Sequence, residues 1–224
     1  ERDIVDKLEN ILALDYPRDR LQVIIASDGS TDATNRLVSP FTERHEHIRL
    51  LALPRLGKAG ALNAAAAQAN GEILVFSDGN SKYAPSAIRQ IVRPFADPSV
   101  GGVAGDQRYI SPDANTSGSG EKSYWNFDRI LKIYESRGGN VISATGAIYA
   151  IRRDLFQSVP EGVTDDFVTS TRVIAQGKRL VFARDAVAYE PVSKSVGMEF
   201  GRKVRILTRG LNAVLMMRQL ANPV

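Results

Sequence analysis

Residues 21–29 read LQVIIASDG, and residues 72–79 read EILVFSDG. Each is a short run of apolar, largely β-branched residues followed by turn-forming residues, a pattern typical of a buried strand. Asp28 and Asp78 therefore follow the carboxyl ends of two predicted strands. Ligands of open parallel sheets bind beyond such ends. Two carboxylates at one sheet edge suit a ligand that carries a base, a diphosphate and a divalent cation, so the pattern predicts a nucleoside-diphosphate site.

The first 106 residues alternate between helical and strand patterns. Helix-forming segments precede and separate four predicted strands, at residues 21–26, 48–53, 72–77 and 100–104. This alternation is typical of a parallel sheet that is covered by helices on both faces. We therefore predict an α/β fold with a mostly parallel, twisted sheet flanked by helices.

The second half of the chain has a less regular pattern. Polar, glycine-rich residues 111–120 predict a loop, and apolar residues at alternating steps of three and four predict a long helix after it. Further strands are predicted at residues 141–143 and 147–151 and, as two short strands, within residues 179–189. Helices are predicted from Asp165 to Gln176 and from about Met198 onward. We expect this half to be mixed rather than purely parallel.

Length, charge and cysteine content restrict the class of protein. The 224 residues are enough for one domain with a full core. The net charge is +4, and residues 193–224 hold six basic residues against one acidic residue, so the remainder is close to neutral. This basic segment is either a solvated helix face or a surface attracted to an anionic ligand or a lipid surface. No nucleic-acid recognition module accompanies it, so no nucleic-acid partner is expected.

The chain contains no cysteine, which excludes disulfide scaffolds and thiolate metal sites. No apolar run is long enough to predict a membrane span.

Two motifs in the first half are suited to binding a nucleotide. Residues 28–32, DGSTD, join a strand-end carboxylate to the predicted start of a helix, whose free amides can bind an anion. The same residue types are also favoured as simple helix caps. Residues 57–63, GKAGALN, place Lys58 at a glycine-flanked helix start. There it is either a diphosphate contact or a surface lysine beside a tight turn.

Two further motifs carry carboxylates. Asp78 and Asn80 lie two residues apart in a predicted turn, where their oxygens can face one hard cation or simply form the turn. Asp165 and Asp166 begin a predicted helix, where they either stabilise its positive end or place one carboxylate in a cleft as a general base. Neighbouring side chains do not share a helix face, so at most one of this pair is expected to be the base.

Taken in this order, the motifs resemble those of the family 2 glycosyltransferases, which are inverting enzymes with a nucleotide-binding fold of the GT-A type. The resemblance covers nearly the whole chain. It implies a set of residues that bind the nucleotide-sugar donor, namely Asp28, Gly29, Ser30, Asp32, Lys58, Asn63 and Arg205.

The resemblance also implies roles for the acidic motifs. Asp78 and Asn80 would hold Mg²⁺ or Mn²⁺ on the donor diphosphate. Gly146 and Asp165 would lie on the acceptor side, and Asp166 would be the catalytic base. Within a single domain, residues 1–106 would bind the nucleotide sugar, residues 107–192 would face the acceptor, and residues 193–224 would form a basic amphipathic tail.

Enzymes of this family move a sugar from a nucleotide-diphosphate sugar, most often a UDP-sugar, to an acceptor hydroxyl. The resemblance therefore implies a glycan or a lipid-linked molecule as acceptor. Membrane-bound relatives continue from such a tail into membrane spans. This implies a location at the cytoplasmic side of the cell membrane, with membrane contact through the C-terminal segment.

Three departures from the family pattern are visible. The opening strand, which usually ends in Pro-x-Tyr-Asn-Glu, is absent from this chain, and Asn80 stands where a second aspartate is usual at the metal. Only Arg205 is kept from the Gln-x-x-Arg-Trp motif of processive members. The first two departures favour one alternative, a nucleotide-sugar-binding or degenerate domain without turnover. A second alternative, nucleotidyl transfer to a sugar phosphate, is disfavoured because no basic glycine-rich loop lies near the start.

Overall fold

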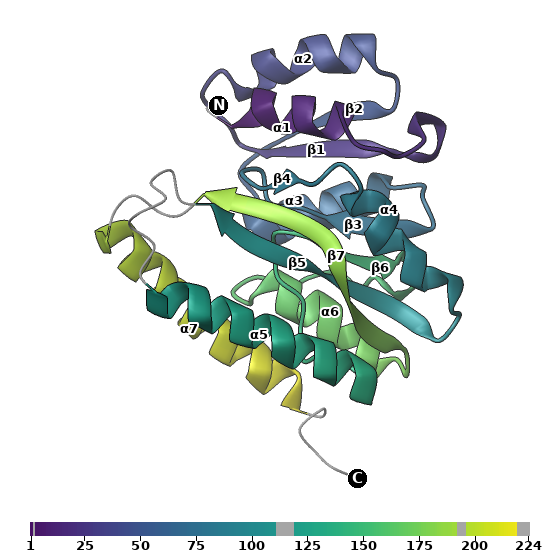
Figure 1. Cartoon of the computed structure of the whole chain (residues 1–224). Helices are drawn as coiled ribbons and strands as arrows, with labels where there is room; N and C mark the ends of the chain where they lie inside the picture. The colour runs from purple at the N-terminus through teal and green to yellow at the C-terminus, as the bar shows by residue number, and fades with distance from the viewer. Residues whose placement is uncertain (2, 111–118, 192–195, 219–224) are drawn as a thin grey trace.

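The computed structural model describes residues 1, 3–110, 119–191 and 196–218. Its first half follows the predicted order of helices and strands, with one unpredicted two-residue strand added at Lys82–Tyr83 (Figure 1). Two short 3₁₀ turns lie at Arg18–Arg20 and Arg93–Ala96. The other elements are α1 (Ile4–Leu12), β1 (Val23–Asp28), α2 (Thr34–Arg44), β2 (Ile48–Leu53), α3 (Gly57–Gln68), β3 (Ile73–Phe76), β4 (Lys82–Tyr83), α4 (Ala87–Val92) and β5 (Val100–Ile110).

The second half contains the long helix and the acidic helix that the sequence predicts. Most of the predicted loop at residues 111–120 lies outside the described residues, and a 3₁₀ turn lies at Arg153–Leu155. The other elements are α5 (Ser119–Gly138), β6 (Tyr149–Arg152), α6 (Asp165–Ala175), β7 (Arg179–Pro191) and α7 (Val196–Met216).

Three strand predictions differ from the structure. The strand predicted at residues 100–104 continues to Ile110 as β5, because its second half pairs with β7. The prediction of a strand at residues 141–143 is wrong. Val141 is fully buried, which explains its apolar side chain, but its N–H makes a single hydrogen bond, to the Leu180 carbonyl, that does not extend into a ladder. The two short strands predicted within residues 179–189 are one strand, β7. A shift in register, with Gly105 opposite Ala183 and the next residue opposite Val187, accommodates the exposed residues 184 and 185 without ending the strand.

The strands form a two-stranded sheet, β1-β2, and a five-stranded sheet in the order β3-β6-β5-β7-β4. The β1–β2 and β5–β7 pairs are parallel, whereas β3–β6, β5–β6 and β4–β7 are antiparallel. No hydrogen-bonded ladder joins the two sheets within the described residues, so the four strands of the first half do not form the single parallel sheet that their alternation with helices predicts. In Figure 1, α1 and α2 lie over β1 and β2 at the top of the view, and α5, α6 and α7 lie on the other side of the larger sheet, at the bottom.

Buried side chains hold the larger sheet against its helices. The ring of Phe76 on β3 stacks on the ring of Tyr149 on β6, with centroids 4.6 Å apart. Both side chains are buried, together with Leu74 on β3, Ala104 on β5 and Leu180 on β7. This packing fixes the ends of β3 and β6, from which the loops of the candidate site project.

Candidate active site

Strand register brings the loops with predicted site residues to the same edges. Phe76, the last residue of β3, pairs with Tyr149, the first residue of the antiparallel strand β6. The turn after β3 and the loop before β6 therefore leave the sheet at the same edge. Asp28, the last residue of β1, pairs with Leu53, the last residue of the parallel strand β2. The loop that leads from β2 into α3 consequently lies beside Asp28.

Lys58 joins two of the predicted carboxylates. Its Nζ lies 2.9 Å from Asp78 Oδ1 and 3.1 Å from Asp165 Oδ2. Burial opposes the charge of this lysine, but the two aspartates outweigh that effect and raise the pKa of Lys58 above its ordinary value. The first turn of α3 therefore places a permanent cation between the turn after β3 and the start of α6.

The carboxylate of Asp166 lies near that of Asp78, beside Gly146. A Cβ atom at Gly146 would lie 2.9 Å from Asp78 Oδ2 and 3.5 Å from Asp166 Oδ2. The two carboxylates thus converge on one backbone position, where an added Cβ would displace the carboxylate of Asp78. Lys58, Asp78 and the adjacent pair Asp165 and Asp166, three positions far apart in the sequence, therefore belong to one cluster.

The two adjacent aspartates have different contacts. Asp165 is paired with Lys58, whereas Asp166 Oδ1 accepts a hydrogen bond from the Phe167 N–H at 2.8 Å. Burial, and then the charge of Asp165, raise the pKa of Asp166 to about 6. A carboxylate with this pKa is a stronger base than an ordinary aspartate and is still largely ionised at neutral pH. Asp166 is therefore the member of the pair with the properties of a general base.

Asp28 contributes to the cluster through the backbone of α3. Its carboxylate accepts hydrogen bonds from the Leu56 and Gly57 N–H groups, immediately before Lys58. Gly29 follows with a φ of +63°, and a Cβ there would lie 2.8 Å from Arg55 Cβ. Asp28 and Gly29 thus fix the loop that delivers Lys58. The predicted contact of Asp28 with a nucleotide base stays a prediction.

The remaining donor-binding predictions are not joined to this cluster by any contact between described side chains. Ser30 accepts a hydrogen bond from Ser27 Oγ, and Asp32 accepts one from the Thr34 N–H. Asn63 exchanges two hydrogen bonds with the backbone of Val159, at 2.9 and 2.8 Å. Arg205 lies exposed on α7 and has no hydrogen-bond or ion-pair partner within the described ranges. Their predicted roles in donor binding stay predictions.

Sequence reasoning missed Lys7, which is only 5% exposed. Its Nζ donates hydrogen bonds to Ser77 Oγ and to the Ser81 carbonyl, both at 2.6 Å, on either side of Asp78 and Asn80. A signal was available in the sequence. Lys7 lies three residues after Ile4 and four before Ile11, which places it on the apolar face of α1.

A divalent cation fits the turn after β3. Asp78 offers a carboxylate, and the exposed side chain of Asn80 has no hydrogen-bond partner in the described part of the chain. No group of three or more His, Cys, Asp or Glu side chains is arranged around a metal position within those residues. Such a cation would therefore complete its shell with diphosphate or water oxygens, which Mg²⁺ and Mn²⁺ accept.

Buried hydroxyl groups flank the same cluster without a partner among the described residues. They belong to Thr145 beside Gly146 and to Thr164 beside Asp165. Buried polar groups are nearly always hydrogen-bonded, if not to protein then to water or a ligand. These two positions are consistent with a polar ligand or ordered water at the cluster.

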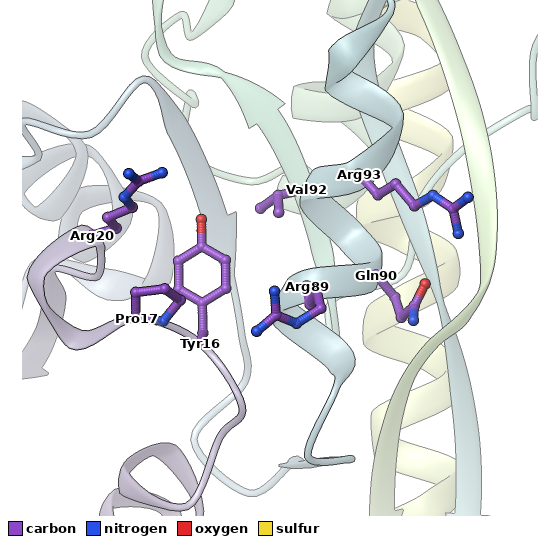
Figure 2. A pocket seen from close by; sticks show the side chains of 7 residues that line it. All are labelled: Tyr16, Pro17, Arg20, Arg89, Gln90, Val92 and Arg93. Atoms are coloured by element: carbon purple, nitrogen blue, oxygen red, sulfur yellow. The ribbon is translucent and has the colours of Figure 1, made fainter.

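A separate surface pocket of about 380 Å³ lies at the amino end of β1, away from Asp28 at its carboxyl end. Figure 2 shows Tyr16 between Pro17 and Arg20 on one side and α4 with Arg89 on the other. None of the predicted site residues lines this pocket. The acidic cluster, not this pocket, is the candidate active site.

A sequence model described as "Glycosyl transferase family 2" matches residues 1–159, well over half of the chain. The chain belongs to this family. The predicted membership in family 2 is therefore confirmed, and with it the prediction of a glycosyltransferase domain. None of the helices in the described residues is long and apolar enough to cross a membrane.

Relatives and solved structures agree with this assignment. The probable glycosyltransferase YdaM of Bacillus subtilis is 26% identical over 197 residues, covering 82% of this chain and 46% of the relative. The poly-β-1,6-N-acetyl-D-glucosamine synthase of Staphylococcus aureus is 24% identical over 217 residues, covering 95% of this chain and 52% of the synthase. The chain thus spans about half the length of the curated relatives it matches.

The fold is shared with solved glycosyltransferases. The mannosyltransferase PcManGT from Pyrobaculum calidifontis, in complex with GDP-Man and Mn²⁺, superposes with a TM-score of 0.80 and 30% identity over 95% of this chain and 60% of its own. S. aureus TarS (1–349), in complex with UDP-GlcNAc, superposes with a TM-score of 0.65 and 15% identity over 89% of this chain and 57% of its own. The predicted α/β fold of the GT-A type is confirmed.

Proposed function

We propose that this family 2 domain is the catalytic domain of an inverting glycosyltransferase that moves a sugar from a nucleoside-diphosphate sugar to an acceptor hydroxyl. The observation that carries the proposal is the convergence of Lys58, Asp78, Asp165 and Asp166 around Gly146. This cluster combines the ammonium of Lys58, the carboxylate of Asp78 as a ligand for a divalent metal ion, and the carboxyl group of Asp166, whose raised pKa suits a general base. The mannosyltransferase at 30% identity, whose structure contains GDP-Man and Mn²⁺, supports a metal-assisted reaction with such a donor.

In this proposal, Asp166 removes the proton from the acceptor hydroxyl. The hydroxyl oxygen attacks the anomeric carbon from the side opposite the diphosphate, so the new C–O bond forms as the bond to the diphosphate breaks. The bonding electrons leave with the diphosphate oxygen, and the proton stays on Asp166. A base with a pKa of about 6 is suited to this step, because it is both ionised at neutral pH and more basic than a solvated aspartate.

Lys58 stabilises the departing diphosphate, with Arg205 as a second cation if α7 brings it to the donor. A divalent cation held by Asp78 and Asn80 would neutralise charge on the leaving group when bound. Fixed positive charge aimed at a developing anion is typically worth about 3–4 kcal/mol per group. The resemblance favours a UDP-sugar, whereas the structural neighbour at 30% identity contains GDP-Man, so uracil and guanine are the first bases to compare.

The proposal is tested on the full-length protein with UDP-, GDP- and dTDP-sugars, each with and without Mn²⁺. A donor that binds the folded state raises the melting temperature by mass action. We expect one nucleotide class to do so more strongly with Mn²⁺, and the same donor to be hydrolysed or transferred. If no nucleotide stabilises the folded protein, the proposed function is wrong.

The alternative from the sequence, a binding domain without turnover, gives a different result in the same experiment: stabilisation by the donor without any consumption of it. The position of Asp166 favours catalysis. A partly buried carboxylate without an ion-pair partner in the described residues, with a raised pKa, costs stability and serves no purpose in donor binding alone.

We further propose that α7 contacts the cytoplasmic face of the cell membrane. Ala213 and Met217 are buried, while a second face of the helix carries exposed apolar side chains at Leu207, Leu211, Val214 and Leu215. Exposed Arg205 and Arg209 flank that face. Apolar residues beside basic ones are typical of helices that lie on anionic lipid surfaces.

Flotation with vesicles of phosphatidylcholine and phosphatidylglycerol tests this contact. We expect binding that increases with the anionic lipid content and is lost in a Leu207→Ser, Leu211→Ser double variant. Equal flotation of the variant would contradict a contact through this face of α7.

A further inference from the structure

Lys7 contacts the turn of the candidate site from its inner side. The Nζ atom donates to Ser77 Oγ and to the Ser81 carbonyl at 2.6 Å, and it lies 3.3 Å from Ser81 Oγ. It also lies 4.2 Å from the centre of the Tyr83 ring, which is buried. All the described polar contacts of this ammonium are therefore made with the segment that carries Asp78 and Asn80.

Ser81 contacts both the turn that contains Asp78 and the loop that contains Gly146. It is fully buried, and its N–H donates to the Asp78 carbonyl at 3.3 Å. Its hydroxyl oxygen lies 2.9 Å from the same carbonyl and 3.2 Å from the carbonyl of Ala147, the residue after Gly146. Ser81 thus connects the ammonium of Lys7 to the turn that contains Asp78 and to the loop that contains Gly146.

Lys7 is a costly residue for a purely structural task. No carboxylate lies within ion-pair distance of its Nζ in the described part of the chain, and burying a cation without an ion pair is unfavourable. Burial lowers the pKa of Lys7 to about 8, although the charges of Asp78 and Glu190 oppose this effect. An apolar side chain of the same length would fill the space at lower cost. Departures of this kind are expected where a residue serves a functional site.

We propose that Lys7 is a positioning residue that fixes the Ser77–Ser81 turn so that Asp78 and Asn80 face one cation and the donor diphosphate. Lys7 does not contact the donor; it acts through the two serines. The inference rests on the proposed function, because it assigns the metal and the diphosphate to this turn. Groups that orient metal ligands in this way typically change metal affinity by about 10–100-fold when they are removed.

The test uses Lys7→Met in the full-length protein, with two measurements. Hydrogen exchange of peptides covering residues 77–83 reports the order of the turn without any ligand. Electron paramagnetic resonance of free Mn²⁺, in the presence of UDP or of GDP, reports the metal affinity. We expect faster exchange in these peptides and about tenfold or greater weakening of Mn²⁺ binding, with metal-free binding of the nucleoside diphosphate changed much less.

Asn10→Ala is the matched control. Asn10 lies on the same helix and exchanges hydrogen bonds with the backbone of Tyr83, at 2.9 and 2.7 Å, beyond the turn. Its removal costs stability in the same layer of the fold. We expect the Asn10→Ala protein to keep the Mn²⁺ affinity of the wild type.

Each result decides the inference. A folded Lys7→Met protein with wild-type Mn²⁺ affinity would overturn it, and so would equal weakening by Asn10→Ala, since Lys7 would then be a structural support only. If Lys7→Met does not fold, Lys7→Gln and Ser81→Ala are measured in the same way, and wild-type affinity in both overturns the inference. In the Asp78→Asn background, adding Lys7→Met is expected to cause no further loss.

The outcome for the proposed function is read from the wild type alone. A wild-type protein that binds Mn²⁺ with neither UDP nor GDP contradicts the metal-assisted mechanism and, with it, this role of Lys7. Suppose instead that the wild type binds Mn²⁺ together with UDP or GDP, and that the Lys7→Met variant binds Mn²⁺ equally well. This result contradicts the inference about Lys7 and leaves the proposed function standing.

Discussion

The ammonium of Lys58 lies 2.9 Å from Oδ1 of Asp78, although the two residues belong to different elements of the fold. The residue assigned to the diphosphate therefore forms an ion pair with the residue assigned to the metal. A divalent cation on Asp78 would repel this ammonium and compete with it for the carboxylate, which favours movement of the ammonium to the diphosphate. Metal and nucleotide are consequently expected to bind together, with weak metal binding alone.

Lys58→Met separates these two effects. Without nucleotide, we expect tighter Mn²⁺ binding than in the wild type, because the competing ammonium is gone. With the nucleoside diphosphate, we expect weaker nucleotide binding, by about 1.5–3 kcal/mol for the loss of a charged hydrogen bond. Calorimetric titration checks both signs. Lys82→Met, which breaks an exposed ion pair with Asp6, is the control, and a parallel fall in both affinities would contradict the exchange.

Asp166→Asn tests the base. We expect turnover to fall by about 10²–10⁴-fold, because the acceptor proton loses its receiver, while donor affinity stays nearly constant. Steady-state kinetics and donor titration measure the two quantities. Glu161→Gln removes an exposed carboxylate shortly before α6 and should leave both unchanged. Full turnover in the Asp166→Asn protein would remove this residue from the mechanism.

The pH profile reports the same group. A general base works only when it is deprotonated, and the pKa of Asp166 is raised to about 6 by burial and by Asp165. The specificity constant kcat/KM should therefore decline as the pH falls through about 6, not through the range near 4 of an ordinary carboxylate. Because the charge of Lys58 lowers the pKa of Asp166, Lys58→Met should move this limb to higher pH. A limb below pH 5 in the wild type would contradict the assignment.

Asp166→Asn should also stabilise the fold at neutral pH. The folded pKa of about 6 lies above the ordinary value of 3.8, so between these values the native state keeps a proton that the unfolded state has released. Stability therefore falls as the pH rises through this window and stays lower above it. Asparagine avoids the cost, and we expect a gain of about 1–2 kcal/mol at pH 7, reduced because the carboxyl is partly exposed. Denaturant titrations should show the gain vanishing near pH 4.

Gly146→Ala probes the convergence of the carboxylates. The added Cβ would lie 2.9 Å from Asp78 Oδ2, closer than side chains tolerate, and the carboxylate must move away. We expect a folded protein with turnover reduced by about 10²-fold, since a displacement of about 1 Å in a reacting site has this effect. Gly138→Ala, where a Cβ meets nothing within 4 Å, is the matched control. Equal activity of both variants would argue that the convergence of Asp78 and Asp166 at Gly146 does not matter for the reaction.

Local patterns in the sequence predicted the strands that deliver Asp28 and Asp78, the acidic helix at Asp165, and the loop with Lys58. These predictions succeeded because apolar runs and turn-forming residues act within a few neighbours along the chain. The order of the motifs was enough to identify the family. The strand predicted at residues 141–143 failed because one apolar residue there is buried against β7 without forming a ladder.

Pairing between distant segments was decided by the tertiary structure alone. Helix position alone did not distinguish Asp165 from Asp166, and the family resemblance pointed to Asp166; the structure adds that Asp165, not Asp166, is paired with Lys58. It also placed Lys7 on an apolar helix face, without indicating that its ammonium reaches Ser77 and Ser81. Propensity and hydrophobic period extend over a single element, whereas the charge environment of a side chain depends on which loops the sheet register brings together. The sequence by itself therefore determined the elements and their chemistry, and only the folded chain determined which of these groups act on one another.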